Sequence, residues 1–382
     1  MNVPLFITFA TDKHLIIRTR MKKKMRYILF LPFSILYGIG TSVRNWLYDK
    51  GFISIKEKPV SLISVGNLTT GGTGKTPHVE FILSELQTLF RVAMLSRGYK
   101  RKTKGFILAN TSSDAHQIGD EPFQVYQKFR NVPVAVCENR SDGIDKLLQL
   151  FPKLDAVILD DAFQHRKIRA GLSVLLTDYK RLHTRDHILP GGNLRESSRG
   201  CKRADIIIVT KCPLDIKPID MRVIEHEVRP TIFHEVFFSA YEYDEPLPLF
   251  IRYADEHWLF RKIKKREAGI LLITGIVSPK MIHEHLSQYT TDIQNINFND
   301  HHDFTKKDII MIEKKFNEIK NPEKLILVTE KDGARLIKNK NISNSLKYHI
   351  FVLPIRVKIL NNKETTLIKK ITDYVGENSG NR

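Results

Sequence analysis

The sequence has few cysteines, and their spacing argues against the folds and sites that cysteines build. Its 382 residues include only Cys137, Cys201 and Cys212, and no two of them form a Cys-x-x-Cys pair. A disulfide framework or a zinc site is therefore not expected. A reducing compartment such as the cytosol fits this composition best.

Long apolar runs are also lacking, since no stretch reaches the roughly 20 apolar residues of a membrane-spanning helix. Residues 27–40, YILFLPFSILYGIG, come part of the way and follow a basic cluster at residues 18–26. No small-x-small cleavage site follows, which argues against a signal peptide. We expect an interfacial anchor with its basic side chains on anionic headgroups. The alternative is a buried core helix with a solvated basic flank.

Acidic residues are outnumbered, with 42 Asp and Glu against 61 Lys and Arg, so the net charge is +19. This excess indicates an acidic partner, which is nucleic acid, anionic lipid or a phosphorylated substrate. A non-enzymatic nucleic-acid binder is the weaker alternative, because no RRM, KH or zinc-finger pattern is present.

Short Val/Ile/Leu runs alternate with helical patterns from residue 59 onward, which predicts a doubly wound, mostly parallel α/β sheet. The expected strands before residue 213 are 61–65, 92–95, 132–136, 156–159, 172–176 and 205–209. A second set at 269–275, 324–329 and 349–355 predicts a smaller α/β domain, joined by a ribbon at 231–243. We therefore expect a dispensable extension at 1–20, a docking segment at 21–50, a core at 51–213 and a C-terminal domain at 214–382.

A glycine-rich loop carries the strongest local signal: Gly71-Gly72-Thr73-Gly74-Lys75-Thr76 lies between an expected strand and an expected helix. In a P-loop, backbone N–H groups and the helix N-terminus bind phosphates. Lys75 would reach the β- and γ-phosphates and Thr76 would hold Mg²⁺. Thr69 stands where the usual pattern has its first glycine. A plain glycine turn is the alternative.

Two carboxylates, Asp160 and Asp161, end the expected strand at 156–159, as in a Walker B motif that holds the metal ion. The alternative is a helix cap or a solvated strand end. Gln164, His165 and Arg166 follow two residues later. The Gln164 or His165 side chain would orient phosphate or substrate, and the Arg166 side chain would neutralise charge.

Acidic and histidine residues recur at two further places. Asp120 begins an expected helix, where an N-cap role competes with a chemical one. The run at 300–303, Asp-His-His-Asp, lacks further metal ligands at suitable spacing, so an Asp–His catalytic dyad or a surface loop are the alternatives.

Seven ordered motifs between about residues 26 and 358 closely resemble those of the tetraacyldisaccharide 4′-kinase (lipid A 4′-kinase) family. They are 65–77 (VGNLTTGGTGKTP), 95–99 (LSRGY), 119–122 (GDEP), 160–165 (DDAFQH), 189–196 (LPGGNLRE), 300–302 (DHH) and 329–332 (TEKD). Ala162 departs from a more usual glycine, a change that the turn should tolerate.

The resemblance implies transfer of the γ-phosphoryl group of ATP to the 4′-hydroxyl of a tetraacyldisaccharide 1-phosphate, giving lipid IVA. It implies nucleotide contacts from Thr69, Thr70, Gly71, Gly72, Thr73, Gly74, Lys75, Thr76, Gln164, Arg195 and Glu196. It implies Mg²⁺ contacts from Thr76, Ser96, Asp160 and Asp161. It implies Asp120 as catalytic base with a supporting histidine, for which we choose His301 and keep His302 open. Lys75, Asp160 and Asp161 complete the catalytic set.

The resemblance also implies a peripheral enzyme on the cytoplasmic face of the bacterial inner membrane, because its four-chain lipid substrate stays in the bilayer. Its partners are then this lipid and the anionic membrane surface. No nucleic acid is needed, and a monomer is expected. The competing enzyme class is a partitioning- or transport-type ATPase. Many of those place Lys before the Gly-Gly pair, where this chain has Thr70.

Overall fold

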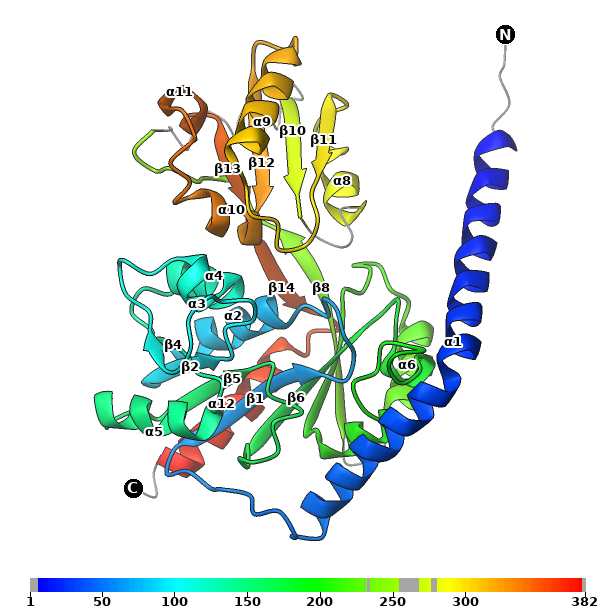
Figure 1. Cartoon of the computed structure of the whole chain (residues 1–382), viewed down its shortest axis with the longest axis vertical. Coiled ribbons are helices and arrows are strands. Elements are labelled where there is room, and N and C mark those ends of the chain that lie inside the picture. The colour runs from blue at the N-terminus through cyan, green and yellow to red at the C-terminus, as the bar shows by residue number, and fades with distance from the viewer. Residues whose placement is uncertain (1–5, 230, 232–233, 254–267, 276–279, 380–382) are drawn as a thin grey trace. The chain divides into compact units, whose positions relative to one another are not determined.

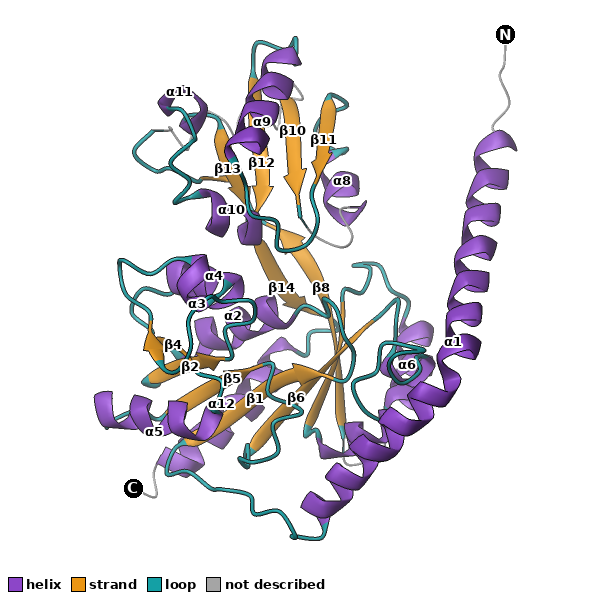
Figure 2. Cartoon of the chain, viewed as in Figure 1, coloured by secondary structure: helices purple, strands orange, loops and turns teal. Residues whose placement is uncertain are grey.

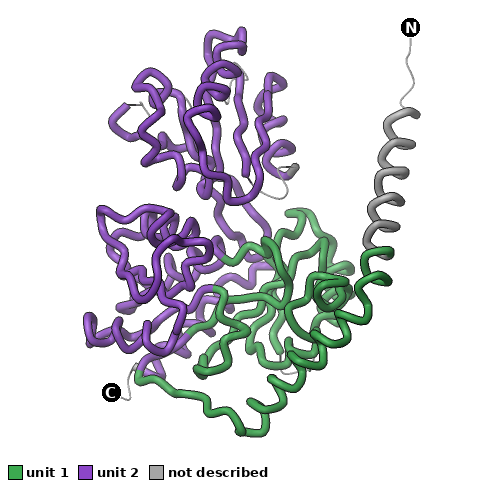
Figure 3. Tube along the Cα trace, in the orientation of Figure 1, with its two compact units in different colours: residues 1–59, 63–75, 161–239 green, residues 60–62, 76–160, 240–382 purple. Residues whose placement is uncertain are grey.

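The computed structural model describes residues 6–229, 231, 234–253, 268–275 and 280–379, and the side chains of its first helix from residue 25 onward. Helices and strands alternate along the chain (Figures 1 and 2), which confirms the α/β class. The chain forms two compact units (Figure 3). Unit 1 comprises residues 1–59, 63–75 and 161–239, and unit 2 comprises residues 60–62, 76–160 and 240–382. The division at residue 213 and the extension at 1–20, of which residues 1–5 lie outside the description, remain predictions.

Unit 1 contains a parallel sheet segment in the order β8-β7-β6-β1. Its strands are β1 (Ser61–Asn67), β6 (Leu172–Asp178), β7 (Ile206–Thr210) and β8 (Glu235–Tyr243), although the ends of β1 and β8 reach into unit 2. Its helices are α1 (Phe6–Asp49) and α6 (Pro218–Val228), with 3₁₀ turns η1 (His183–Arg185) and η2 (Ser198–Arg203). Both β1 and β7 are buried along their whole length, as continuous apolar strands covered on both faces should be.

Unit 2 begins with a second sheet segment in the order β5-β2-β4-β3, in which only the short edge strand β3 is antiparallel. Its strands are β2 (Val92–Ser96), β3 (Ile107–Leu108), β4 (Val134–Val136) and β5 (Ala156–Asp160). Its helices are α2 (Lys75–Leu86), α3 (Ala115–Ile118), α4 (Asp120–Lys128) and α5 (Arg140–Leu150). Because β2 and β5 are parallel neighbours, Ser96 and Asp160 come to the same carboxyl edge, where such sheets bind ligands.

The rest of unit 2 holds a five-stranded sheet in the order β11-β10-β12-β13-β9. Its strands are β9 (Leu247–Pro248), β10 (Gly269–Thr274), β11 (Ile293–Asn297), β12 (Lys324–Thr329) and β13 (Ile350–Leu353), and β14 (Ile355–Ile359) follows. Its helices are α8 (Lys280–Leu286), α9 (Lys306–Glu318), α10 (Glu330–Leu336), α11 (Asn344–Lys347) and α12 (Glu364–Ser379). Along β10, Leu271 and Ile273 pack in the cluster of α9, whereas Ile270 and Leu272 pack in that of α8. This alternation is the two-residue period of a strand covered on both faces.

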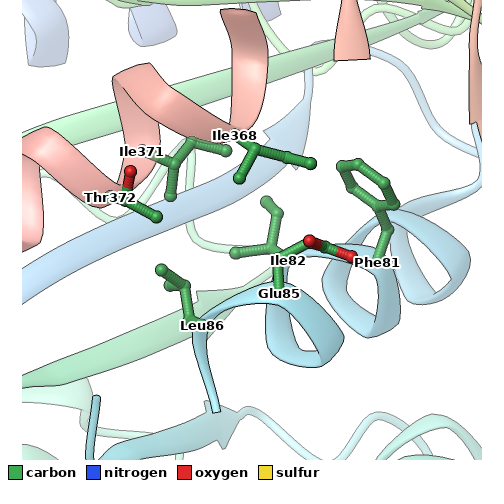
Figure 4. A pocket seen from close by; sticks show the side chains of 7 residues that line it. All are labelled: Phe81, Ile82, Glu85, Leu86, Ile368, Ile371 and Thr372. Carbon is green, nitrogen blue, oxygen red and sulfur yellow. The ribbon is translucent and has the colours of Figure 1, made fainter. Parts of the chain in front are cut away.

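Helix α12 packs against helix α2, which follows the glycine-rich loop. Phe81, Ile82 and Leu86 of α2 and Ile368 and Ile371 of α12 line a small apolar pocket (Figure 4). These contacts cover part of the apolar face of α2.

Helix α1 extends beyond the apolar segment expected at residues 27–40. Met25–Asp49 is long and apolar enough to cross a membrane by length and composition alone, and little of it is buried. The helix continues through Pro32 and Gly38 without a break.

Candidate active site

The glycine-rich loop joins β1 to α2, as the sequence predicts. Gly71 and Gly74 have φ values of +97° and +86°, which L side chains rarely adopt. The Thr73 N–H donates to the Gly71 carbonyl at 3.0 Å and closes the loop. The space beside Gly72 is open to 4 Å, so a phosphate group can approach this backbone closely.

Four side chains that the motif did not reveal hold this loop in unit 1. Asn67 Nδ2 donates to Thr73 Oγ1 at 2.7 Å, and Thr210 Oγ1 donates to the Thr73 carbonyl at 2.8 Å. Arg181 donates to the Thr70 carbonyl at 2.9 Å, and Lys211 donates to the Gly72 carbonyl. Thr210 and Lys211 directly follow the predicted strand at 205–209, so their position at a strand end was the available signal.

Asp161 lies between two cations of unit 1. Arg195 donates to its two oxygens at 2.8 and 3.2 Å, and Lys75 Nζ lies 3.7 Å from Oδ1. Its φ of +48° is left-handed, a strained conformation that is typical of functional sites. The structure thus brings together three residues that lie 34 to 120 positions apart in the sequence.

Glu196 is fully buried and accepts hydrogen bonds from three side chains of unit 1. Arg203 donates at 2.8 Å, Asn45 of α1 at 2.6 Å and Gln164 at 3.3 Å. Gln164 also donates to the Asn67 carbonyl at 2.7 Å, so the predicted pair Gln164 and Glu196 lies directly behind the loop. The role of Asn45 could not be read from the sequence, because α1 looked only apolar and basic there.

In unit 2, Asp160 and Ser96 are candidate metal-binding residues. Asp160 is buried, and Ser96 Oγ donates to its Oδ2 at 3.1 Å. Thr76 is the second residue of α2, directly after Lys75. Among the described residues no group of three or more His, Cys, Asp or Glu side chains forms a metal cage. Carboxylate and hydroxyl oxygens in this small number fit Mg²⁺, which is usually held by one or two carboxylates, water and substrate phosphates.

Asp120 does not cap its helix, so the capping alternative is wrong. It is the first residue of α4, the N-cap is Gly119, and no side chain caps that end. Its Oδ2 instead lies 2.5 Å from His301 Nδ1, and both side chains are buried. His302 faces Asp308 at 3.0 Å within the cap of α9. Of the two neighbouring histidines, the structure therefore brings only His301 to Asp120.

Arg335 of α10 completes the Asp120 cluster and was missed from the sequence. Its Nε and Nη2 donate to the two Asp120 oxygens, each at 2.7 Å. Burial alone would raise the pKa of Asp120, but the hydrogen bonds from His301 and Arg335 outweigh it and hold that pKa below its ordinary value. Lys331 lies one turn earlier on α10, with Nζ 3.3 Å from His301 Nε2 and 2.6 Å from Asp300. The four-residue spacing of Lys331 and Arg335 was the signal that could have found this face.

In unit 2, Lys128 of α4 lies between Glu80 of α2 and Glu330 of α10 and so connects the three helices. Lys128 Nζ lies 2.7 Å from Glu80 and 3.1 Å from Glu330. Burial and the neighbouring charge of Glu330 raise the pKa of Glu80 to about 7, because two carboxylates share one cation.

Known proteins match this chain over most of its length. The model of the tetraacyldisaccharide-1-P 4′-kinase family matches residues 26–374. A protein named tetraacyldisaccharide 4′-kinase from Bacteroides fragilis is 45% identical over 92% of this chain and 93% of its own. Its namesake from Flavobacterium psychrophilum is 43% identical over 94% and 99%. A crystal structure of LpxK from Aquifex aeolicus in complex with ATP is 29% identical, with a TM-score of 0.70 over 91% of this chain and 99% of that one.

Proposed function

Because the chain belongs to the tetraacyldisaccharide-1-P 4′-kinase family, we infer that it transfers the γ-phosphoryl group of ATP to the 4′-hydroxyl of a tetraacyldisaccharide 1-phosphate. The observation that carries this inference is the phosphate loop with Lys75 beside Asp161 and Arg195. The enzyme is a kinase of lipid A biosynthesis, and the partitioning-type ATPase is not favoured.

The roles of the individual side chains follow from their charges. The backbone of residues 69–74 and the cations Lys75 and Arg195 hold the triphosphate and stabilise the charge that develops during transfer. Asp160, Asp161, Ser96 and Thr76 would hold Mg²⁺, which would neutralise phosphate charge when bound. Gln164 and Glu196 keep the loop and Arg195 in place.

Asp120 and His301 act on the acceptor hydroxyl. As the 4′-oxygen bonds to the γ-phosphorus and the bond to the β–γ bridging oxygen breaks, the hydroxyl proton passes to the Asp120–His301 pair. The 2.5 Å contact supports a single proton-accepting unit. Arg335 keeps Asp120 ionised and directed at His301.

The test is a phosphoryl-transfer assay with γ-labelled ATP, Mg²⁺ and detergent-dispersed tetraacyldisaccharide 1-phosphate. We expect label in a doubly phosphorylated lipid, no label with an acceptor that lacks the 4′-hydroxyl, and none with Lys75→Ala. Release of label only as inorganic phosphate would favour the ATPase instead.

The binding of α1 to an anionic membrane surface is the finer part of this proposal. Its exposed apolar side chains include Leu29 (71%), Leu36 (68%), Phe33 (60%) and Ile39 (55%). Ser34 and Gly38 are buried within this apolar stretch, and Tyr48 is buried near the end of the helix. This polarity is inverted relative to a helix on a soluble protein, and an apolar surface of this kind marks an interaction site. We infer that it enters the acyl boundary on the cytoplasmic face of the inner membrane.

A pair of truncations tests the membrane surface. Removing residues 1–20 should leave vesicle sedimentation and lipid phosphorylation nearly intact. Removing residues 1–45 should release the protein from vesicles of anionic lipid and raise the KM for the lipid. If the longer truncation still sedimented and kept its lipid KM, α1 would not be the anchor.

A further inference from the structure

The inner face of α1 contacts one loop of unit 1 at several points between Arg26 and Asn45. Arg26 donates to the carbonyls of Pro190 (2.9 Å) and Gly192 (3.2 Å). Ser34 Oγ accepts from the Gly191 N–H at 2.9 Å in a buried contact. A Cβ on Gly191 would lie 2.8 Å from this hydroxyl, so only glycine allows the close approach. The helix thus holds the loop through polar contacts while its apolar side chains point outward.

The same loop runs on to the phosphate loop. The Thr70 N–H donates to the Asn193 carbonyl at 2.7 Å, and the Arg195 N–H donates to the Leu68 carbonyl at 2.8 Å. Tyr37 of α1 donates to the Arg195 carbonyl at 3.1 Å. Residues 193–195 are therefore bonded both to α1 and to the start of the phosphate loop.

Side-chain hydrogen bonds continue this connection from α1 to Asp161. Asn45 donates to Glu196 at 2.6 Å, Gln164 donates to Glu196 and accepts from Arg195, each at 3.3 Å, and Arg195 binds Asp161. Arg44 donates to Asn45 Oδ1 at 3.2 Å, which directs the Asn45 NH₂ group at Glu196. Every member of this path belongs to unit 1.

We propose that Asn45 of α1 is a positioning residue of the nucleotide site, because it fixes Glu196 and, through Gln164, sets Arg195 against Asp161 beside Lys75. The proposal rests on the nucleotide site described under the proposed function. It gives α1 a second role, in which the outer face of the helix meets lipid and the inner face shapes the site for ATP. An anchor-only helix would influence the KM for lipid alone.

Asn45→Asp tests the proposal with an isosteric change. It replaces a donor by a carboxylate that faces buried Glu196, so we expect kcat/KM for ATP to fall at least about 10-fold, as for a lost hydrogen bond to a charged group. Sedimentation with vesicles of phosphatidylethanolamine and phosphatidylglycerol should not change. The matched control is Leu36→Ser on the outer face, which should weaken sedimentation and leave the affinity for ATP unchanged without lipid.

A double variant separates positioning from misfolding. In Asn45→Asp with Glu196→Gln, the new amide can donate to the new carboxylate, so the double variant should be less impaired than the product of the two single effects. Strictly multiplicative losses, or an Asn45→Asp variant whose kinetics for ATP match the parent within twofold, would overturn the proposal.

Lipid phosphorylation by the parent protein distinguishes a failure of the proposed function from a failure of the positioning role. If it phosphorylates no lipid but Asn45→Asp still weakens ATP binding, the positioning role stands and the proposed function fails. If it phosphorylates lipid and Asn45→Asp behaves as the parent does, only the positioning role fails.

Discussion

The phosphate loop and the Asp120–His301 pair are built in opposite ways. The shape of the loop is local: residues 67–75 run from the end of β1 to the start of α2, and backbone conformation at Gly71 and Gly74 shapes it, while Arg181, Thr210 and Lys211 bind it from outside. The pair is non-local, because 181 residues separate its members and side-chain charges from α10 hold it together. A local site needs the right residues in a row, whereas a non-local site needs the fold to bring them together.

The largest effect is expected at the non-local pair. Asp120→Ala and His301→Ala should each lower kcat by about 10²–10⁴-fold, the usual range for a general base. If the two act as one unit, the double variant should be little worse than the more damaged single one. Steady-state kinetics with saturating ATP and lipid measure this.

The Asp120→Ala and His301→Ala variants should still fold. In Asp120→Ala, Arg335 still has Asp303, whose Oδ1 lies 3.0 Å away. His302→Ala is the matched control and should keep kcat within a few fold. Losses that multiply would show that Asp120 and His301 act separately.

The phosphate loop should respond next. Lys75→Ala removes one preorganised cation from the transferring phosphoryl group, so kcat should fall by about 10²–10³-fold. The loop glycines keep their conformation, and thermal unfolding should therefore change little. Lys180→Ala serves as the charge control. Lys180 is exposed and precedes Arg181, which binds the phosphate loop. Near-normal turnover of Lys75→Ala would remove the loop from the chemistry.

Arg335 tests what holds the non-local pair. Arg335→Gln removes the cation that lowers the pKa of Asp120, so that pKa should rise and the acid limb of kcat/KM should move to higher pH. His301 also contacts this carboxylate, Lys331 contacts His301, and Glu121 contacts Lys331. Activity should then fall more at pH 6 than at pH 8.

Arg335→Lys provides the matched comparison for this prediction. It keeps the charge but cannot bind both oxygens in the same fork, so its pH profile should shift less. An equal loss at every pH in Arg335→Gln would mean that Arg335 only packs α10 against α4.

The smallest effect concerns stability, at Glu80. Its pKa is raised from 4.5 to about 7, so the folded protein keeps a proton that the unfolded chain loses. Stability should therefore fall as pH rises from about 4.5 to about 7 and then level off. Glu80→Gln removes this titration, so the Tm of the variant should vary less than that of the parent between about pH 4.5 and pH 7. Each kcal/mol of unfolding free energy corresponds to roughly 2–4 °C in Tm. Glu85→Gln, on the same helix, should keep the parent's slope, and an unchanged slope in Glu80→Gln would contradict the prediction.

The local features of this protein could be predicted from its amino-acid sequence. Continuous apolar runs predicted the buried strands, and the glycine-rich run predicted the phosphate loop between β1 and α2, because backbone conformation and burial depend on neighbouring residues. The ordered motifs indicated the family for the same reason. Ends of elements were less certain: α1 runs on past Gly40, since a helix tolerates small residues that a hydropathy pattern treats as a break.

Which distant side chains meet could not be predicted, because the packing of the folded chain sets those contacts. Nothing in the sequence distinguished His301 from His302, because their difference is the direction each ring takes after the turn at residue 301, where φ is +63°. Arg335 reaches Asp120 only because α10 packs on α4, and Asn45 reaches Glu196 only because α1 lies along the loop at residues 187–196. Such contacts join residues more than 100 positions apart, and their geometry is set by the packing of whole helices rather than by any local pattern.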